Sequence, residues 1–344
     1  MRALALTGIR QAELVDWPEP TIEKDTDVLL KVEMVGICGS DVHYYDTGRI
    51  GSLVIEYPHI IGHECAATVK AVGDAVSRVK VGDRVVVDPA MHCGRCDQCK
   101  AGRYNTCRNI RFLGNPGESP GCMRERIVMP QESCFPVGDD FSFERAVLCE
   151  PLAIGLYAVK QAHLRPDSDV AILGSGPIGL SCLVFARHAG VRACYVTEKI
   201  QERIKVAEEA GATWVGNPDK QDVVKEILKR QPAGMDVVFE CAGEQQALDQ
   251  AVEVLKPGGT LMLIGIPRVE RVSFVIDTLR RHEITIVNVR RQSKSTQQCI
   301  ELVASGQVDP DFMITHRFSL EQGEQALQLV SDYRDGVVKA LVEI

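Results

Sequence analysis

The sequence predicts a two-domain α/β protein in which a β-rich first part precedes a doubly wound parallel sheet. Its 344 residues are more than one compact core ordinarily holds. Short alternating apolar runs fill the first part of the chain, whereas strands and amphipathic helices alternate further on. We expect a first domain at residues 1–153, a second at 154–287, and a tail, 288–344, that returns to the first domain.

Short runs with apolar residues at every second position predict that the first part is mostly antiparallel sheet. Residues 28–35, 66–72 and 84–87 are such runs, and a turn at Lys80-Val81-Gly82-Asp83 precedes the last of them. Alternation with a period of two is typical of strands that bury one face.

The rhythm then changes to the strand–helix alternation that is typical of a parallel sheet. The predicted strands are Val170–Leu173, Cys194–Thr197, Val237–Glu240 and Leu261–Gly265, with a further one at Val272–Ile276 near the end of the sheet. The predicted helices are Pro177–Ala189, Gln201–Ala210, Gln221–Arg230 and Gln245–Leu255. The tail has helical patterns at Ser295–Ala304 and Leu320–Asp332 and a last strand at Val337–Glu343, too little core to stand alone.

Composition excludes several classes of function. A net charge of -8 disfavours nucleic-acid binding, which needs clustered Lys and Arg, and no apolar run is long enough to span a membrane. Thirteen cysteines without a secretion signal indicate thiols and metal ligands in a reducing compartment, so we expect a cytoplasmic protein. Six of them are expected to be buried small apolar residues: Cys122, Cys134, Cys182, Cys194, Cys241 and Cys299.

A glycine-rich turn, Gly174-Ser175-Gly176-Pro177-Ile178-Gly179, lies between a predicted strand and a predicted helix. The glycines allow a pyrophosphate to approach the backbone, and the helix N-terminus offers N–H donors. Glu198 ends the next strand, where a carboxylate can accept hydrogen bonds from both ribose hydroxyls and repel a 2′-phosphate. We therefore expect a Rossmann domain that prefers NAD to NADP. Further expected cofactor contacts are Lys199, Arg203, Ile264 and Ile266.

Four closely spaced cysteines, Cys93, Cys96, Cys99 and Cys107, predict a metal site. Four thiolates can close a tetrahedral zinc site with no open position, which makes the zinc structural. An iron–sulfur cluster is the alternative, but the long last gap and the absence of a proline after Cys107 favour zinc. A zinc ribbon that binds nucleic acid is a third possibility, disfavoured by the acidic charge.

A second set of potential ligands is dispersed along the chain: Cys38, His63, Glu64 and Glu150. Each has an ordinary explanation when taken singly. Together they supply the mixed sulfur, nitrogen and oxygen donors that leave a catalytic zinc one exchangeable position. Cys149, next to Glu150, is a possible substitute for it, although adjacent side chains diverge.

These motifs resemble those of the zinc-containing medium-chain dehydrogenases, most of all the sorbitol (polyol) dehydrogenases. The resemblance rests on residues 36–44 (GICGSDVHY), Gly62-His63-Glu64, Glu150-Pro151-Leu152 and the cofactor turn. It implies a β-rich, GroES-like catalytic domain beside the Rossmann domain, with one catalytic and one structural zinc. It also implies Cys38, His63 and Glu64 as ligands, with Glu150 either ligating or holding the zinc-bound water.

The resemblance further implies the substrate and the assembly. Tyr44, Glu150 and Arg290 match positions that touch a polyol in sorbitol dehydrogenases, and subunits of the family usually form tetramers through their Rossmann domains. We expect reversible oxidation of a secondary alcohol of a polyol to the ketose, with NAD. Ser40 would take the proton and pass it through the nicotinamide ribose to His43.

Two other functions stay open at this point. A threonine 3-dehydrogenase-like enzyme would share both zinc sites and need a cationic partner for the substrate carboxylate, which Arg290 or Arg291 could supply. A catalytically silent NAD-binding protein would keep the fold, but it would have no need for a full set of metal ligands and relay residues.

Overall fold

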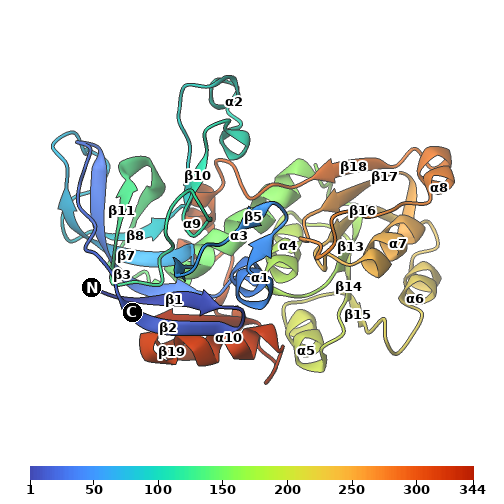
Figure 1. Ribbon diagram of the computed structural model, residues 1–344. Coiled ribbons are helices and arrows are strands. Elements are labelled where there is room, and N and C mark those ends of the chain that lie inside the picture. Colours follow the sequence, from blue (N-terminus) through green and yellow to red (C-terminus); the bar gives the residue numbers. More distant parts are fainter. The chain divides into compact units, whose positions relative to one another are not determined.

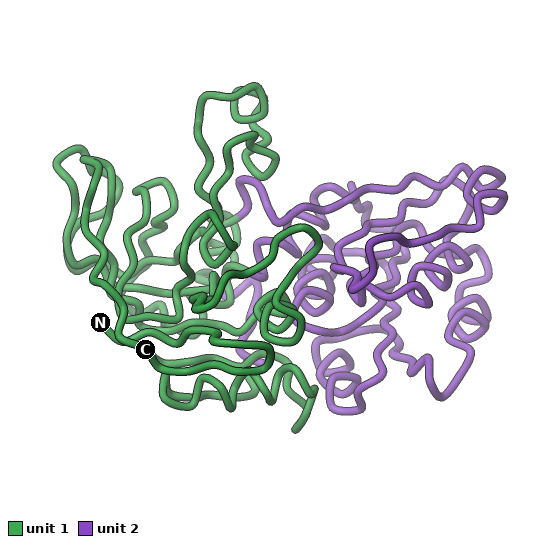
Figure 2. Tube along the Cα trace, in the orientation of Figure 1, with its two compact units in different colours: residues 1–150, 296–305, 314–344 green, residues 151–295, 306–313 purple.

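The computed structural model describes residues 1–344, which divide into two compact units (Figure 2). Unit 1 comprises Met1–Glu150, Thr296–Ser305 and Ile314–Ile344, and unit 2 comprises Pro151–Ser295 and Gly306–Met313. The long helix α3 (Phe143–Gln161) runs through the boundary after Glu150. No helix is long and apolar enough to cross a bilayer.

A seven-stranded sheet forms the centre of unit 1. Its strands run in the order β12-β8-β7-β3-β20-β19, and β11 also pairs with β3. All neighbours are antiparallel except β19 and β20. The bounds are β3 (Asp27–Gly36), β7 (Glu64–Val72), β8 (Arg84–Val87), β11 (Arg126–Pro130), β12 (Cys134–Val137), β19 (Ile314–Ser319) and β20 (Lys339–Glu343). The three strands predicted from alternation are thus confirmed. Strands β19 and β20 of the tail belong to this sheet, whereas residues 288–295 and 306–313 group with unit 2.

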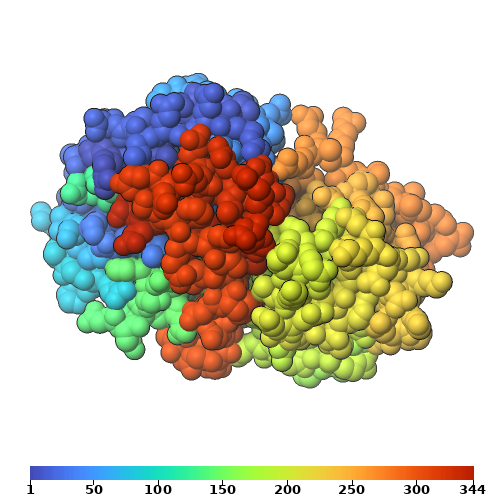
Figure 3. Space-filling model, turned by 90° about the horizontal axis from the view of Figure 1, so that it is seen from below, coloured from blue at the N-terminus to red at the C-terminus, as the bar shows by residue number.

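Smaller elements of unit 1 surround this sheet (Figure 1). The short strands are β1 (Arg2–Gly8), β2 (Gln11–Asp16), β4 (Arg49–Ile50), β5 (Leu53–Val54), β6 (His59–Ile60), β9 (Ala90–Met91) and β10 (Arg111–Phe112). The helices are α1 (Gly39–Thr47), α2 (Asp97–Lys100), α9 (Thr296–Ala304) and α10 (Gly323–Ser331). The C-terminal residues, red in Figure 3, lie against the N-terminal residues, blue, where Arg10 donates a 2.9 Å hydrogen bond to Ser331.

Unit 2 is a doubly wound parallel sheet, as the strand–helix alternation predicts. Its six strands lie in the order β15-β14-β13-β16-β17-β18, and every pairing is parallel. The strands are β13 (Asp169–Leu173), β14 (Ala193–Thr197), β15 (Trp214–Gly216), β16 (Met235–Glu240), β17 (Leu255–Leu263) and β18 (Thr285–Asn288). The helices are α4 (Pro177–His188), α5 (Gln201–Glu209), α6 (Val223–Arg230), α7 (Gln245–Val254) and α8 (Ile276–Arg281).

The predicted strand at Val272–Ile276 is wrong. Residues 272–275 form no strand, and α8 begins at Ile276. The side chain of Gln245 occupies both backbone groups of Ser273, accepting from its N–H at 2.9 Å and donating to its carbonyl at 2.8 Å. Those groups are therefore unavailable for a ladder, and β18 forms the edge of the sheet instead.

Several predicted boundaries shift for local reasons. Helix α6 begins at Val223 rather than Gln221 because the Asp222 carboxylate caps it, accepting from the Lys225 N–H at 3.0 Å. Strand β17 begins at Leu255, six residues earlier than predicted. In the tail, α10 begins at Gly323, after a 3₁₀ turn, and β20 begins at Lys339.

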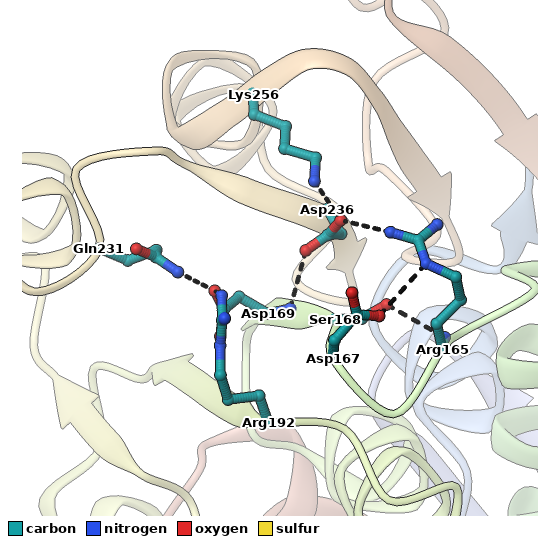
Figure 4. Close-up of polar contacts among 8 residues, drawn as sticks. All are labelled: Arg165, Asp167, Ser168, Asp169, Arg192, Gln231, Asp236 and Lys256. Carbon is teal, nitrogen blue, oxygen red and sulfur yellow. Dashed lines mark hydrogen bonds and ion pairs between the residues drawn. The ribbon is translucent and has the colours of Figure 1, made fainter.

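The amino ends of β13 and β16 carry a polar network (Figure 4). Asp236 accepts hydrogen bonds from the Asp169 backbone N–H at 2.9 Å and from Arg165 at 3.3 Å, and it also pairs with Lys256. Asp169 in turn pairs with Arg192, 2.9 Å from its Nε, and with Gln231. These side chains pair with one another at the end of the sheet opposite to the glycine-rich turn. We therefore interpret the network as structural.

All thirteen cysteines are free. Five of the six that were expected to be small core residues are buried, whereas Cys241 is only half-buried. Cys241 follows the carboxyl end of β16, where the strand leaves the core.

Candidate metal and cofactor sites

Cys38, His63 and Glu64 come together in unit 1, although 25 positions separate Cys38 from His63. Their ligand atoms all lie within 4.8 Å of one another. Cys38 caps α1 directly after β3, and Glu64 begins β7, where it pairs with Gly36. Neighbouring antiparallel strand ends thus place all three donors at one point.

Asp41 holds two of these ligand segments together. Its carboxylate is buried and accepts 3.0 Å hydrogen bonds from the backbone N–H groups of Cys38 and Gly62, and it lies 3.6 Å from Nδ1 of His63. Although burial opposes the charged ring, the Asp41 carboxylate and the Cys38 thiol raise the pKa of His63 well above its usual value. An Nδ1 partner of this kind directs Nε2 of a histidine toward a metal.

Glu64 is fully buried and paired with an equally buried lysine. Nζ of Lys339 lies 2.8 and 2.7 Å from its two carboxylate oxygens and donates to the Ile37 carbonyl at 3.0 Å. Gly36 makes room for this pair, because a Cβ there would lie 2.3 Å from Oε2 of Glu64. Lys339 begins β20, so the returning tail contributes directly to this site.

Glu150 brings a second carboxylate to the same region. It is buried, its Oε2 has no hydrogen-bond partner, and it interacts electrostatically with His63, Glu64 and Lys339. Burial, reinforced by the carboxylates of Glu64 and Asp88, raises the pKa of Glu150 to about 7. A buried carboxylate oxygen without a partner is costly unless a cation or water completes it.

Cys149 does not substitute for Glu150 in this arrangement. Its Sγ contacts the Arg145 carbonyl at 3.3 Å and packs beside Cys299. The donors that converge are therefore one thiol, one imidazole and one carboxylate, a set that fits a catalytic zinc, and Glu150 lies outside this cluster but interacts with it electrostatically.

Helix α1 presents Ser40, His43 and Tyr44 within two turns of Cys38. Ser40 and His43 are half-buried, and Tyr44 is buried. The Tyr44 hydroxyl lies 3.5 Å from Oδ1 of Asn115, whose Nδ2 donates to Glu118 at 3.2 Å. This places a polar contact at the end of an otherwise buried phenol.

The four cysteines of the α2 loop also converge. Sγ of Cys96 lies 3.6 Å from that of Cys99 and 3.9 Å from that of Cys107. Four thiolates around one zinc, each about 2.3 Å from it, would be about 3.8 Å apart. These distances favour a single ion over a cluster, whose cysteines bind different iron atoms. The backbone N–H groups of Arg95 and Cys96 lower the pKa of Cys93 to about 6, which favours a thiolate.

In unit 2 the glycine-rich turn has the geometry that a pyrophosphate site needs. Gly174 has φ +96° and Gly176 caps α4, which begins with Pro177 and Ile178. A Cβ on Gly179 would lie 1.9 Å from the Gly174 carbonyl oxygen, so no side chain fits there. Nη1 of the buried Arg203 lies 3.6 Å from the position of a Cβ on Gly176, which puts a positive charge at the turn.

The Glu198 carboxylate accepts hydrogen bonds from the protein that the sequence did not indicate. One carboxylate oxygen accepts from the Ser175 N–H at 2.8 Å and its hydroxyl at 3.1 Å. The other accepts from the N–H groups of Lys199 and Ile200 at 2.8 and 3.0 Å. Glu198 therefore ties β14 to the cofactor turn, and a ribose hydroxyl would share or replace one of these donors.

The remaining predicted contacts also belong to unit 2. Ile264 and Ile266 follow β17, and Ile266 is half exposed. Lys199 pairs with Glu244 at 2.9 Å. Arg290 is exposed, just beyond β18.

Four residues of these sites were missed in the sequence: Asp41, Lys339, Asn115 and Ser175. The spacing of Asp41 three residues after Cys38 is a capping signal that could have found it. A lysine within the apolar run Val337–Val342 is a second overlooked signal, because a charge there needs a partner.

Comparison with known proteins agrees with this geometry. Residues 24–139 match the alcohol dehydrogenase GroES-like domain, and residues 177–305 match the zinc-binding dehydrogenase domain. Sorbitol dehydrogenase of Bacillus subtilis is 38% identical over 99% of this chain and 97% of its own. L-idonate 5-dehydrogenase of Vitis vinifera is 34% identical, over 92% of this chain and 87% of its own.

A solved structure extends the comparison. A zinc-binding dehydrogenase of Sinorhizobium meliloti, bound to NADP, superposes with a TM-score of 0.89 and 33% identity over 100% of this chain and 99% of that one. The fold and the matching domains define a zinc-binding dehydrogenase. The chain belongs to the zinc-containing medium-chain dehydrogenase family.

The four-cysteine loop should contribute stability rather than activity. Changing Cys96 to Ser leaves three thiolates, so the ion binds more weakly and its folding contribution is lost. We expect a lower melting temperature and one zinc fewer per chain, with residual activity at low temperature. Elemental analysis and thermal unfolding measure this, and iron in place of zinc would contradict the assignment.

Glu64 and Glu150 should respond differently to neutralisation. Glu64→Gln leaves Lys339 buried without a counter-charge and should cost about 3–5 kcal/mol of stability as well as zinc. Adding Lys339→Met should restore stability but not zinc affinity. Glu150→Gln breaks no ion pair and should keep zinc and stability while lowering kcat about 10–100-fold.

Zinc content and thermal unfolding of the three proteins separate these outcomes. If Glu150→Gln loses its zinc while the double variant Glu64→Gln/Lys339→Met retains it, the ligand is Glu150 and Glu64 is structural.

Proposed function

We propose that this chain is a zinc-dependent polyol dehydrogenase that reversibly oxidises a secondary alcohol to a ketone with NAD. The observation that carries the proposal is the donor cluster of Cys38, His63 and Glu64 beside the unpartnered oxygen of Glu150. In a purely structural site, every buried polar atom would have a hydrogen-bond partner within the protein. The two relatives above are by name dehydrogenases of sorbitol and of L-idonate.

Cys38, His63 and Glu64 would hold the catalytic zinc, and Glu150 would orient the water or alcohol at its open position. When bound, zinc supplies Lewis acidity that lowers the pKa of an alcohol toward neutrality. The ligand charges of one thiolate and one carboxylate offset the ion, and Lys339 compensates one of the two carboxylates. Cys93, Cys96, Cys99 and Cys107 would hold a second, structural zinc.

The chain's own residues would move the proton and orient the substrate. Ser40 lies two residues from Cys38 on α1 and would accept the alcohol proton, with His43, three residues further, as its route to solvent. Tyr44 and Arg290 would bind the other hydroxyls of a polyol. The buried phenol of Tyr44, with Asn115 at its hydroxyl, supports a polar rather than an apolar substrate.

NAD is the proposed cofactor, because the Glu198 carboxylate stands where a 2′-phosphate would have to bind. Solved structures of this fold hold NADP in one case and NADH in another, so a preference must come from individual side chains. Here the positive groups nearest the turn are Arg203 and Lys199. Lys199 is paired with Glu244, and Nη1 of Arg203 lies beside Gly176 of the turn, which supports a role for Arg203 near the cofactor phosphates.

A threonine 3-dehydrogenase-like activity is not favoured, because the two relatives above are by name dehydrogenases of sorbitol and of L-idonate. A catalytically silent protein would not need the buried, unpaired Glu150.

A rate survey tests the function. Purified protein is assayed with NAD and with NADP against sugar alcohols, threonine and simple alcohols, and kcat/KM values are compared. We expect a secondary alcohol of a polyol to give the highest value, with NAD at least about tenfold better than NADP because of charge repulsion at Glu198. Highest activity with threonine, or equal values with both cofactors, would contradict the respective part of the proposal.

The same assay tests the proton route. His43→Ala should lose rate most strongly near neutral pH and approach the wild-type rate at alkaline pH, where hydroxide removes the proton. A loss that is independent of pH would assign His43 a structural role.

We also propose a homo-oligomer, as a tetramer, joined through unit 2. Strand β18 is the last of its sheet, and in the segment that connects β17 to β18 the side chains of Val269, Val275 and Ile276 are 56%, 65% and 73% exposed. An apolar edge of this kind invites pairing with a second copy. Light scattering at micromolar concentration should give more than one chain per particle, and Val275→Lys/Ile276→Lys should dissociate it. A wild-type monomer would contradict this.

A further inference from the structure

Glu240 stands out among the carboxylates of unit 2 that the proposed reaction does not use. It is the last residue of β16, which lies between β13 and β17 in the sheet, and it is 2% exposed. Its Oε1 accepts hydrogen bonds from the N–H groups of Ala242 and Gly243 at 2.8 and 2.6 Å. Its backbone carbonyl accepts from Ile264 and Gly265 at 3.0 and 2.9 Å. One residue thus binds the segments that follow two neighbouring strands.

Backbones pack against each other directly around Glu240. A Cβ on Gly243, which has φ +70°, would lie 2.7 Å from the Ile266 carbonyl oxygen. A Cβ on Gly265 would lie 2.3 Å from the Gly243 nitrogen and 2.8 Å from Oε2 of Glu240. A shift of residues 241–243 therefore moves residues 264–266 with it.

The same loop also supports the cofactor turn. The Cys241 N–H donates to the Leu173 carbonyl at 2.9 Å, and a Cβ on Gly174 would lie 3.2 Å from the Ala242 nitrogen. The carboxyl ends of β13, β16 and β17 are therefore joined through the backbone of residues 240–243, and the Glu240 carboxylate holds residues 242 and 243 of this loop. Burial raises the pKa of this group, and the N–H groups of Gly243 and Ala242 oppose that shift.

The position of the dinucleotide follows from the strand order. In a dinucleotide bound as this fold ordinarily binds one, the pyrophosphate would lie at the turn after β13 and the adenosine ribose toward Glu198 at the end of β14. Strands β16 and β17 are on the other side of β13, so the nicotinamide half must extend over their carboxyl ends. That is where Glu240 fastens residues 241–243 to residues 264–266.

We infer that Glu240 is a positioning residue for the nicotinamide half of the cofactor, acting through the backbone of residues 264–266. The inference rests on the proposed function, since it requires the dinucleotide to bind in unit 2. The reach of the side chain matters here, because only an acceptor at the length of a glutamate can bind both N–H groups. Its negative charge is not required.

Two substitutions separate reach from charge. Glu240→Asp keeps the charge but is one methylene too short, whereas Glu240→Gln keeps an acceptor oxygen at the same length. Binding is measured for NADH, which has both halves, and for ADP-ribose, which lacks the nicotinamide. Glu240→Asp should weaken NADH binding about tenfold, as expected for the loss of buried hydrogen bonds, and ADP-ribose binding less than about threefold. Glu240→Gln should bind both like wild type.

The matched control is Asp236→Asn, on the same strand. Asp236 is also a largely buried carboxylate that accepts a backbone N–H, but it lies at the opposite end of β16, in the network of Figure 4. The Asp236→Asn variant should have a lower melting temperature, and the ratio of its affinities for NADH and ADP-ribose should equal that of the wild-type protein. A purely structural role of Glu240 would give the same result as this control.

The outcomes are distinct. Equal losses of NADH and ADP-ribose in Glu240→Asp, or no loss of either, would overturn the inference, as would a selective loss in Glu240→Gln as large as that in Glu240→Asp. Should Glu240→Asp not fold, Gly265→Ala displaces the same segment and must show the same selective loss. Failure of the wild-type protein to bind NADH at all would instead overturn the proposed NAD-linked function, and the inference with it.

Discussion

The ion pair of Glu64 and Lys339 is the interaction on which unit 1 depends most. Two charges that are each 1% exposed are tolerated only because each neutralises the other and the remaining proton of Lys339 finds the Ile37 carbonyl. The pair joins residues 275 positions apart and spans the three strands β7, β3 and β20. Gly36 has no alternative in this arrangement, because any Cβ would enter the space of the carboxylate. The geometry of the metal site consequently depends on the register of β7, β3 and β20.

This coupling explains the charge of the site. Without the lysine, the thiolate and the carboxylates of Glu64 and Glu150 would crowd negative charge into a buried space. With it, a positive charge lies against the Glu64 carboxylate, and burial raises the pKa of Glu150. The unpartnered oxygen of Glu150 is what remains for a ligand to satisfy.

The sequence predicts the fold well wherever burial decides the structure. The alternation of β3, β7 and β8 and the strand–helix series of unit 2 are patterns of apolar residues, and these are local. Errors arose where a distant side chain competes for the backbone. Gln245 binds both backbone groups of Ser273 and prevents the strand expected at Val272–Ile276. The residues around Ser273 give no local signal of this contact.

The candidate sites likewise divide into those that a local sequence pattern predicts and those that depend on residues far apart in the chain. Four cysteines within a short loop predict a metal site by themselves. Cys38, His63, Glu64 and Glu150 are dispersed and are grouped only by the mixed ligand types they offer, and the family resemblance then implies the first three as ligands. Lys339 could not be assigned to the site, because it lies in an apolar strand and its partner is known only once the sheet is assembled. The carboxylate of Glu198 was expected to serve the cofactor alone, but four protein donors already use it.

Because most of the thirteen cysteines are buried, fewer thiols of this protein are reactive than their number suggests. Burial raises the pKa of Cys134 and Cys194 to about 12, and adjacent thiols together with burial raise those of Cys122, Cys241 and Cys299. Thiols react as thiolates, so these residues are slow toward alkylating agents and peroxides at neutral pH. Cys93, whose pKa is lowered to about 6, is reactive whenever no metal shields it. Rapid alkylation of Cys93 therefore reports the loss of the ion from the α2 loop.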